Sequence, residues 1–141
     1  MTEELASKLN LQINGTETVQ LSNFVATNNK VRKLGKATLM IKTVNNYKIP
    51  IEVLVVPTIS VPLQNHIKLL DQKSNNLRGL RLAHPITDDD MFEIAVLIGA
   101  DYYWHFVEDH IVREEGPVAV KSKLGYLLSG PVTKLDVILE T

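Results

Sequence analysis

Apolar and polar side chains alternate along much of this chain, and that two-residue period is typical of half-buried β-strands. Residues 31–43 and 47–57 show it best, with Ala37, Leu39 and Ile41 on one face of the first segment. Two asparagines between the segments favour a tight turn, because asparagine tolerates left-handed backbone. The sequence therefore predicts a β-hairpin over residues 31–57.

Helical spacing is confined to short segments. Leu5 and Leu9 lie four residues apart within residues 2–9, where two acids come early and Lys8 comes late. This order suits the helix dipole and predicts a short helix. One or two helical turns are expected again at residues 102–108. Short strands are predicted elsewhere, at residues 11–13, 19–21, 111–112, 118–120 and 124–128.

Residues 58–90 depart from the strand pattern. Pro62 suits the first position of a helix, and Leu63, Ile67 and Leu70 recur at helical spacing. Loop signals fill the rest of the segment. We interpret it as a partly helical insertion between strands and not as a separate domain.

The chain is organised around residues 96–104. Three apolar residues at 96–98 favour a buried strand, and Gly99 then indicates a bend or the close passage of another backbone. Asp101 suits the N-cap of a following helix, which is the simplest explanation of this turn. The aromatic residues 102–104 are expected to pack in the core, since large aromatic side chains dominate core burial.

Composition narrows the class of protein. The 141 residues carry 15 Lys and Arg against 16 Asp and Glu, so no basic field favours nucleic-acid binding. There is no cysteine, which excludes disulfides and thiolate catalysis. No apolar run is long enough for a membrane helix, and the first residues do not have the pattern of a secretory signal. We therefore expect a single soluble domain, intracellular and cytoplasmic, with no membrane or nucleic-acid partner.

Metal and cofactor chemistry finds little support in the sequence. His105 and His110 are five residues apart, which places them on different faces of a helix. The three aspartates at 88–90 lack the glycine and the later glutamate of a calcium loop, so a solvated loop is expected there. Neither a phosphate-binding glycine loop nor a Gly-x-Ser-x-Gly motif is present. We expect no metal and no other cofactor.

Three stretches together carry a resemblance to a known family. They are residues 3–11, the segment 96–104 with its apolar-apolar-Gly motif, and residues 116–131 with Lys-Leu-Gly-Tyr-Leu-Leu-Ser-Gly-Pro. This order of elements resembles a retropepsin-like aspartic protease, most closely the aspartic peptidase domain in polyproteins of BEL/Pao-type retrotransposons. The resemblance covers residues 3 to about 132.

The resemblance implies a fold and an activity. The fold is a mainly β acid-protease barrel over residues 1–132, half of a homodimer, followed by a tail at 133–141. In that family each subunit gives one Asp from an Asp-Ser/Thr-Gly loop to hydrolyse peptide bonds of the polyprotein. The two Asp carboxylates of the homodimer lie side by side in the active site, so they share one proton. A flap closes over the extended polypeptide substrate.

One departure bears directly on catalysis. No Asp in the chain is followed by Ser or Thr and then Gly. The resemblance places the first strand and that triplet before Met1, so no catalytic residue is expected within these residues. We therefore expect an inactive form of the endopeptidase domain. The alternative is a non-enzymatic peptide-binding or dimerisation module.

The remaining site residues follow from the resemblance. The flap matches residues 21–30 by order, so Phe24, Val25 and Ala26 are candidates for contact with a peptide. Gly99 is expected to let its strand pass close to the catalytic loop. Asp101 matches an acid downstream of that glycine, with a structural role near the active site.

Overall fold

The chain folds mainly as β-structure, which confirms the predicted class. Its sheets are open: one has the order β1-β2-β3, one pairs β4 with β5, and one has the order β6-β7-β8. The closed barrel stays a prediction. The computed structural model describes residues 1–21, 30–65, 77, 79–84, 87–113 and 116–130.

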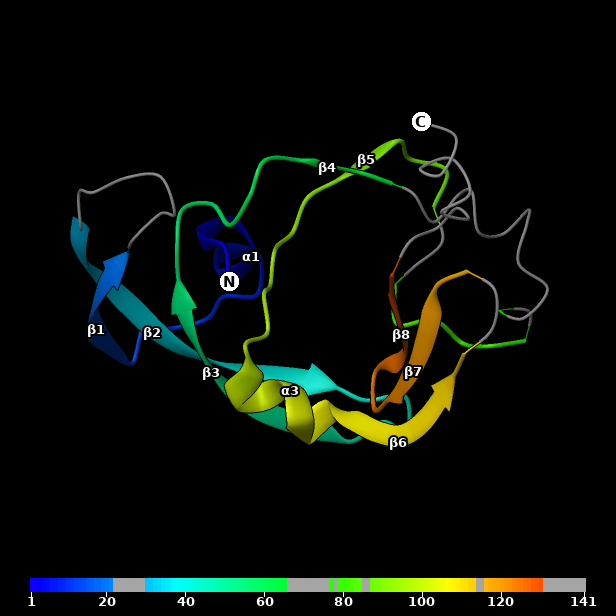
Figure 1. The fold of residues 1–141 in the computed structure, drawn as a ribbon. Helices are drawn as coiled ribbons and strands as arrows, with labels where there is room; N and C mark the ends of the chain where they lie inside the picture. Colours follow the sequence, from blue (N-terminus) through cyan, green and yellow to red (C-terminus); the bar gives the residue numbers. More distant parts are fainter. Residues whose placement is uncertain (22–29, 66–76, 78, 85–86, 114–115, 131–141) are drawn as a thin grey trace. The chain divides into compact units, whose positions relative to one another are not determined.

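Two helices and eight strands are assigned within the described residues (Figure 1). In chain order they are α1 (Glu3–Lys8), β1 (Gly15–Leu21), β2 (Lys30–Lys42), β3 (Lys48–Val55), β4 (Leu63–Gln64), β5 (Met91–Phe92), α3 (Ala100–Phe106), β6 (Val107–Val112), β7 (Val118–Ser122) and β8 (Gly125–Ser129). Neither helix is long and apolar enough to cross a membrane.

The described residues form two compact units. The first unit contains the described residues of Met1–Ile41, together with Lys48–Pro62 and Glu93–Leu97. The second contains Lys42–Tyr47, the described residues of Leu63–Phe92, and those from Ile98 onward. Most of the predicted insertion therefore belongs to the second unit. The predicted tail at 133–141 lies outside the described residues.

The predicted hairpin is confirmed. β2 and β3 are neighbours in the sheet of the first unit, and β1 pairs antiparallel with β2 from Gly15↔Lys36 to Leu21↔Lys30. The strand expected at residues 11–13 is absent, and the chain there leads into β1. β1 is an edge strand in the described sheet.

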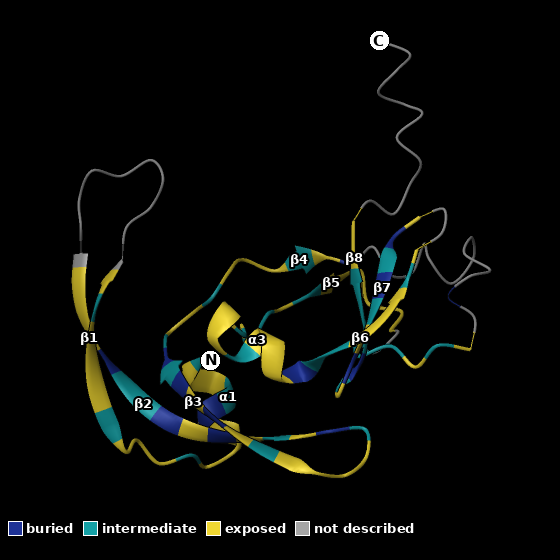
Figure 2. Ribbon diagram, turned by 60° about the horizontal axis from the view of Figure 1, so that its bottom comes forward, coloured by how far each residue is buried: buried dark blue, intermediate teal, exposed yellow. Residues whose placement is uncertain are grey.

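The core of the first unit follows the two-residue period of the strands. Ile51, Val53 and Val55 of β3 are buried and alternate with more exposed residues. Ala37 and Leu39 of β2 are buried in the same way, as the sequence predicted (Figure 2). Burying a Leu, Ile or Val side chain contributes about 1.5–3 kcal/mol, so these residues dominate the stability of the sheet.

The predicted N-terminal helix is also confirmed. Thr2 is the N-cap of α1, and its hydroxyl accepts a hydrogen bond from the Leu5 amide at 3.3 Å. The acids Glu3 and Glu4 occupy the first turn and Lys8 the last, which complements the helix dipole. Ala6 faces the core.

Met1 and Thr2 run as an extended segment beside β3. The Val56 amide donates to the Met1 carbonyl at 2.9 Å, and the Glu3 amide donates to the Val56 carbonyl at 2.8 Å. On its other side, the Thr2 amide donates to the Ala95 carbonyl at 2.8 Å. The start of the chain is thus held between two segments that are distant in sequence.

The second unit is built on the sheet β6-β7-β8. β7 pairs antiparallel with both neighbours, and a register shift interrupts the β6–β7 pairing between Val107 and Ile111. Leu77 and Ala119 form the centre of a small core. All three strands and α3 were predicted from the sequence, within a few residues at their ends.

A glycine lets another segment cross close to β8. Gly125 has φ +112°, and a Cβ placed on it would lie 2.8 Å from the Ala83 amide nitrogen and 2.9 Å from the Arg81 carbonyl oxygen. The crossing segment is held by two hydrogen bonds, from Tyr126 N to Arg81 O at 2.8 Å and from Ala83 N to Tyr126 O at 3.0 Å. A side chain at residue 125 is therefore incompatible with this crossing.

The first residues of the helix expected to begin at Pro62 form a strand instead. Leu63–Gln64 is β4, paired antiparallel with β5, and Ile67 and Leu70 lie outside the described residues. The buried Asn65 explains the preference for a strand. Its amide nitrogen Nδ2 donates to the carbonyls of Thr87 at 3.2 Å and Asp89 at 2.8 Å, and fixes the returning chain beside β4.

Two predictions for the central stretch are wrong. Residues 96–98 form no strand, and Leu97 is 70% exposed, because no neighbouring strand pairs with this segment in the described part of the chain. Trp104 is 72% exposed instead of packing in the core. The helix α3 buries Phe106, two positions further on, and residues two apart lie on different faces of a helix.

Candidate functional site

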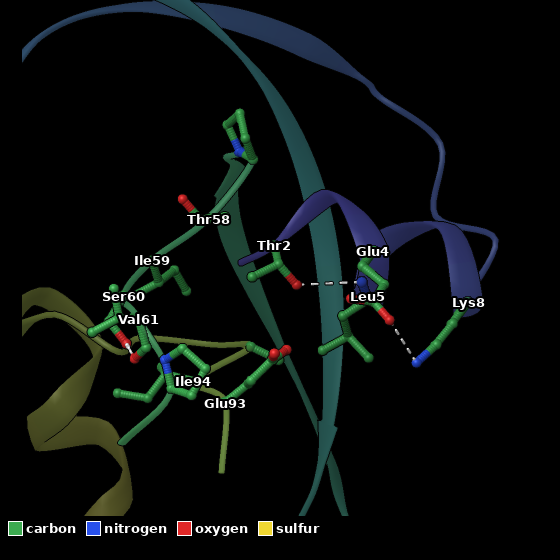
Figure 3. A pocket seen from close by; sticks show the side chains of 13 residues that line it. Thr2, Glu4, Leu5, Lys8, Thr58, Ile59, Ser60, Val61, Glu93 and Ile94 are labelled. Atoms are coloured by element: carbon green, nitrogen blue, oxygen red, sulfur yellow. Dashed lines mark hydrogen bonds and ion pairs between the residues drawn. The ribbon is translucent and has the colours of Figure 1, made fainter. Parts of the chain in front are cut away.

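The candidate site is a pocket of about 440 Å³ in the first unit (Figure 3). It lies between α1 and an irregular segment that follows β3. Its lining residues come from three parts of the sequence and are Thr2, Glu4, Leu5, Lys8, Pro57, Thr58, Ile59, Ser60, Val61, Pro62, Glu93, Ile94 and Ala95.

The helix supplies one wall. Leu5 points into the space between the walls, one turn away from the capped N-terminus of α1 (Figure 3). Glu4 is paired with Lys8 at 3.0 Å, four residues further along the helix. Both side chains are more than two-thirds exposed, so the pair adds little stability and mainly neutralises this edge of the pocket.

The opposite wall is irregular chain that bends repeatedly and lies outside any described strand. Residues 58–60 make no backbone–backbone hydrogen bond within the described part of the protein, and the Val61 carbonyl accepts one from the Ser60 hydroxyl at 2.9 Å. Pro57 and Pro62 flank the segment, and neither can donate a backbone hydrogen bond. The amides and carbonyls of residues 58–60 therefore have no backbone partner among the described residues and can bond with a ligand.

The third wall carries the charge of the site. Glu93 is exposed, its carboxylate points toward the side of Leu5, and it forms no ion pair among the described residues (Figure 3). Beside it, Ala95 is hydrogen-bonded to Thr2, which holds this wall next to the helix. The pocket thus combines apolar side chains such as Leu5 and Ile94 with one carboxylate that has no cation partner among the described residues.

This chemistry suits binding more than catalysis. Free main-chain amides and carbonyls can pair with an extended peptide, as a strand edge does, and an unpaired carboxylate favours a basic side chain nearby. Glu93 and Glu4 are the two acids of the pocket, and Glu4 is engaged by Lys8. Among the described residues, no group of three His, Asp or Glu side chains is placed to hold a metal ion.

The residues predicted from sequence lie elsewhere. Gly99 is the N-cap of α3 with ordinary extended backbone, at φ −80° and ψ 175°, and it belongs to the second unit. Asp101 is therefore not the N-cap. It lies in the first turn, where its carboxylate accepts a hydrogen bond from the Tyr102 amide at 3.0 Å.

A contact explains why glycine suits residue 99. A Cβ on Gly99 would lie 3.0 Å from the Asp101 carboxylate oxygen, which is closer than side chains normally approach. The glycine therefore makes room for the acid of its own helix. The flap candidates Phe24, Val25 and Ala26 lie outside the described residues.

Sequence reasoning missed the pocket. The signal present was a short apolar segment between two prolines, with Ile59 and Val61 separated by a polar residue. Val61 is 76% exposed, but single exposed apolar side chains are common on protein surfaces, so this exposure alone did not single out the segment. Nothing in the sequence around Glu93 marks it as a pocket residue. It reaches the pocket because the chain re-enters the first unit at residue 93, after residues 63–92 of the second unit.

Comparisons with known proteins identify no relative. No protein-family model, no curated protein and no solved structure matches this chain.

Proposed function

We propose that residues 1–132 form a retropepsin-like aspartic peptidase domain of the BEL/Pao retrotransposon type. In this proposal the domain works as a homodimer that holds an extended stretch of polyprotein. The 141 residues contain no Asp-Ser/Thr-Gly triplet, so on their own they bind peptide without hydrolysing it.

The observation that supports the proposal is the position of Met1 and Thr2. Their backbone is hydrogen-bonded to Val56 on one side and to Ala95 on the other. In the family, the chain that follows the catalytic loop passes close to the segment that ends in the apolar-apolar-Gly motif. The hydrogen bond between Thr2 and Ala95 brings together the two corresponding parts of this chain.

The burial of Met1 agrees with this position. Its side chain is only 5% exposed, and its α-amine donates to the Leu54 carbonyl at 2.8 Å. Residue 1 therefore lies inside the unit beside β3, which is compatible with a preceding catalytic loop near the same strand. In the complete enzyme two such loops, one from each subunit, supply carboxylates that share a proton and activate water.

The proposal is tested on the reading frame upstream of codon 1. We expect an in-frame Asp-Ser/Thr-Gly triplet shortly before Met1. The protein extended to include it should dimerise in sedimentation experiments and cleave peptides in a pepstatin-sensitive way, and replacing the new Asp by Asn should abolish cleavage. A stop codon in that interval, or pepstatin-sensitive cleavage by residues 1–141 alone, would contradict the proposal.

A second function, peptide binding without catalysis, is favoured by Glu93, which lines the pocket and forms no ion pair among the described residues. A fluorescently labelled peptide with one Arg between apolar residues should bind to residues 1–141, measured by polarisation. Glu93→Gln should weaken binding several-fold, while Asp109→Asn, which removes an exposed acid from the second unit, should leave it unchanged. Equal affinity of both variants would exclude the pocket as the binding site.

A further inference from the structure

A second, smaller cavity lies in the second unit and has a different chemistry. Its volume is about 260 Å³. It is lined by residues from the turn after β2, from the segment that crosses β8, and from the turn before β8: Lys42, Thr43, Val44, Asn46, Arg81 and Leu124.

Hydrogen bonds hold the walls of this cavity in place. The turn is closed by the Thr43 amide, which donates to the Tyr47 carbonyl at 2.7 Å, and Asn46 takes the left-handed conformation with φ +66°. The Val44 amide donates to the Lys123 carbonyl at 2.8 Å, next to Leu124. The cavity is thus formed by backbone with defined partners.

The charges in the cavity all have one sign. Lys42 and Arg81 come from segments 39 positions apart, and neither forms an ion pair among the described residues. Among the residues that the structure describes, no carboxylate lines the cavity. Since the whole chain has a net charge of −1, this pair of cations is a local feature and not part of a general basic surface.

The hydroxyl of Thr43 adds a directed donor. Thr43 is 7% exposed, and its oxygen accepts a hydrogen bond from the Tyr47 amide at 3.1 Å. Because that bond uses a lone pair of the oxygen, the hydroxyl proton remains available, and it has no acceptor within the described part of the chain. The lining of the cavity therefore includes an arginine, a lysine and a threonine whose hydroxyl proton has no acceptor among the described residues.

We propose that this cavity binds a single phosphate group, either as free phosphate or as a phosphate monoester. Arginine matches the oxygens of a phosphate with two parallel hydrogen bonds, and lysine adds a compact charge. The proposal does not depend on the peptidase proposal, whose supporting hydrogen bonds lie in the first unit. Both cations are exposed, so we expect weak binding, with a Kd on the order of 1 mM.

The test is an NMR titration of ¹⁵N-labelled residues 1–141 with inorganic phosphate. The chemical shifts of the Thr43, Val44 and Asn46 amides report binding. Phenyl phosphate, sodium sulfate and sodium chloride are titrated separately at matched ionic strength. The double variant Lys42→Gln/Arg81→Gln should weaken phosphate binding by about tenfold or more. Lys48→Gln is the matched control, since Lys48 is an exposed cation of β3 that does not line the cavity.

The outcomes separate the sources and test the site. Saturable shifts with phosphate that the double variant loses and the control keeps support the proposal. If phenyl phosphate binds as well, the ligand is a monoester; if it does not, the ligand is the free ion. Equal shifts with chloride, or phosphate binding unchanged in the double variant, would overturn the proposal. Arg81→Lys, which keeps the charge, should bind with intermediate affinity.

Discussion

Replacing Gly125 by alanine should be among the most damaging single substitutions in the second unit. Its φ of +112° is a backbone conformation that residues with a side chain rarely adopt. A new Cβ would also lie 2.8 Å from the Ala83 nitrogen and 2.9 Å from the Arg81 oxygen, which are backbone atoms and have no rotamer to change. The crossing segment must therefore move away from β8.

The magnitude follows from these two effects. A positive φ costs an alanine about 1–2 kcal/mol. Movement of the crossing segment breaks its bonds with Tyr126, one donated to Arg81 and one accepted from Ala83, and each contributes about 1 kcal/mol. We expect a total loss of about 3–4 kcal/mol, which is a large fraction of the 5–15 kcal/mol that stabilises a typical domain.

The assay is urea unfolding followed by circular dichroism, with Gly130→Ala as the matched control. Gly130 also has a positive φ, of +92°, but a Cβ there would meet nothing within 4 Å in the described part of the chain. The control therefore measures the conformational cost alone, about 1–2 kcal/mol. If Gly125→Ala is no more destabilising than Gly130→Ala, the close crossing does not constrain residue 125 and the reasoning is refuted.

Three further predictions use the same unfolding measurement. Asn65→Ala should cost about 2 kcal/mol because it removes two hydrogen bonds donated by the buried Asn65 side chain, each contributing about 1 kcal/mol, while Asn14→Ala, at an exposed side-chain bond, should cost close to nothing; similar losses would contradict this. Thr2→Ala should cost about 1 kcal/mol by removing the helix cap, and Thr2→Ser should keep most of it; equal losses would exclude a role for the hydroxyl. Burial lowers the pKa of the Met1 α-ammonium group below its usual 8.0, so the unfolded chain binds the proton more tightly and stability should rise with pH up to about 8; an α-N-acetylated chain showing the same rise would assign it to another group.

The strands and helices that were predicted correctly depend on local periodicity. Ile51, Val53 and Val55 alternate in sequence and are buried in alternation in the structure. α1 has its cap, its acids and its lysine in the expected order. In these elements the residues that decide the conformation lie within a few positions of one another, so the sequence is sufficient to predict them.

The errors arose where distant partners decide the conformation. Residues 96–98 have the composition of a strand, but a strand also needs a neighbour, and none pairs with them in the described residues. Leu63 has helical spacing to later residues, but the return of the chain at Met91 and Phe92 offers a pairing partner. Composition does not reveal whether such a partner is present.

The candidate sites depend on distant partners even more strongly. The pocket in the first unit takes its walls from residues 2–8, 57–62 and 93–95, and no motif links these three segments. What joins them is backbone hydrogen bonding, from Glu3 to Val56 and from Thr2 to Ala95. A side chain such as Glu93 therefore acquires its place from bonds made by its neighbours and not from its own sequence context. The resemblance to a peptidase family could indicate that these segments meet, but only the hydrogen bonds define which side chains face the space between them.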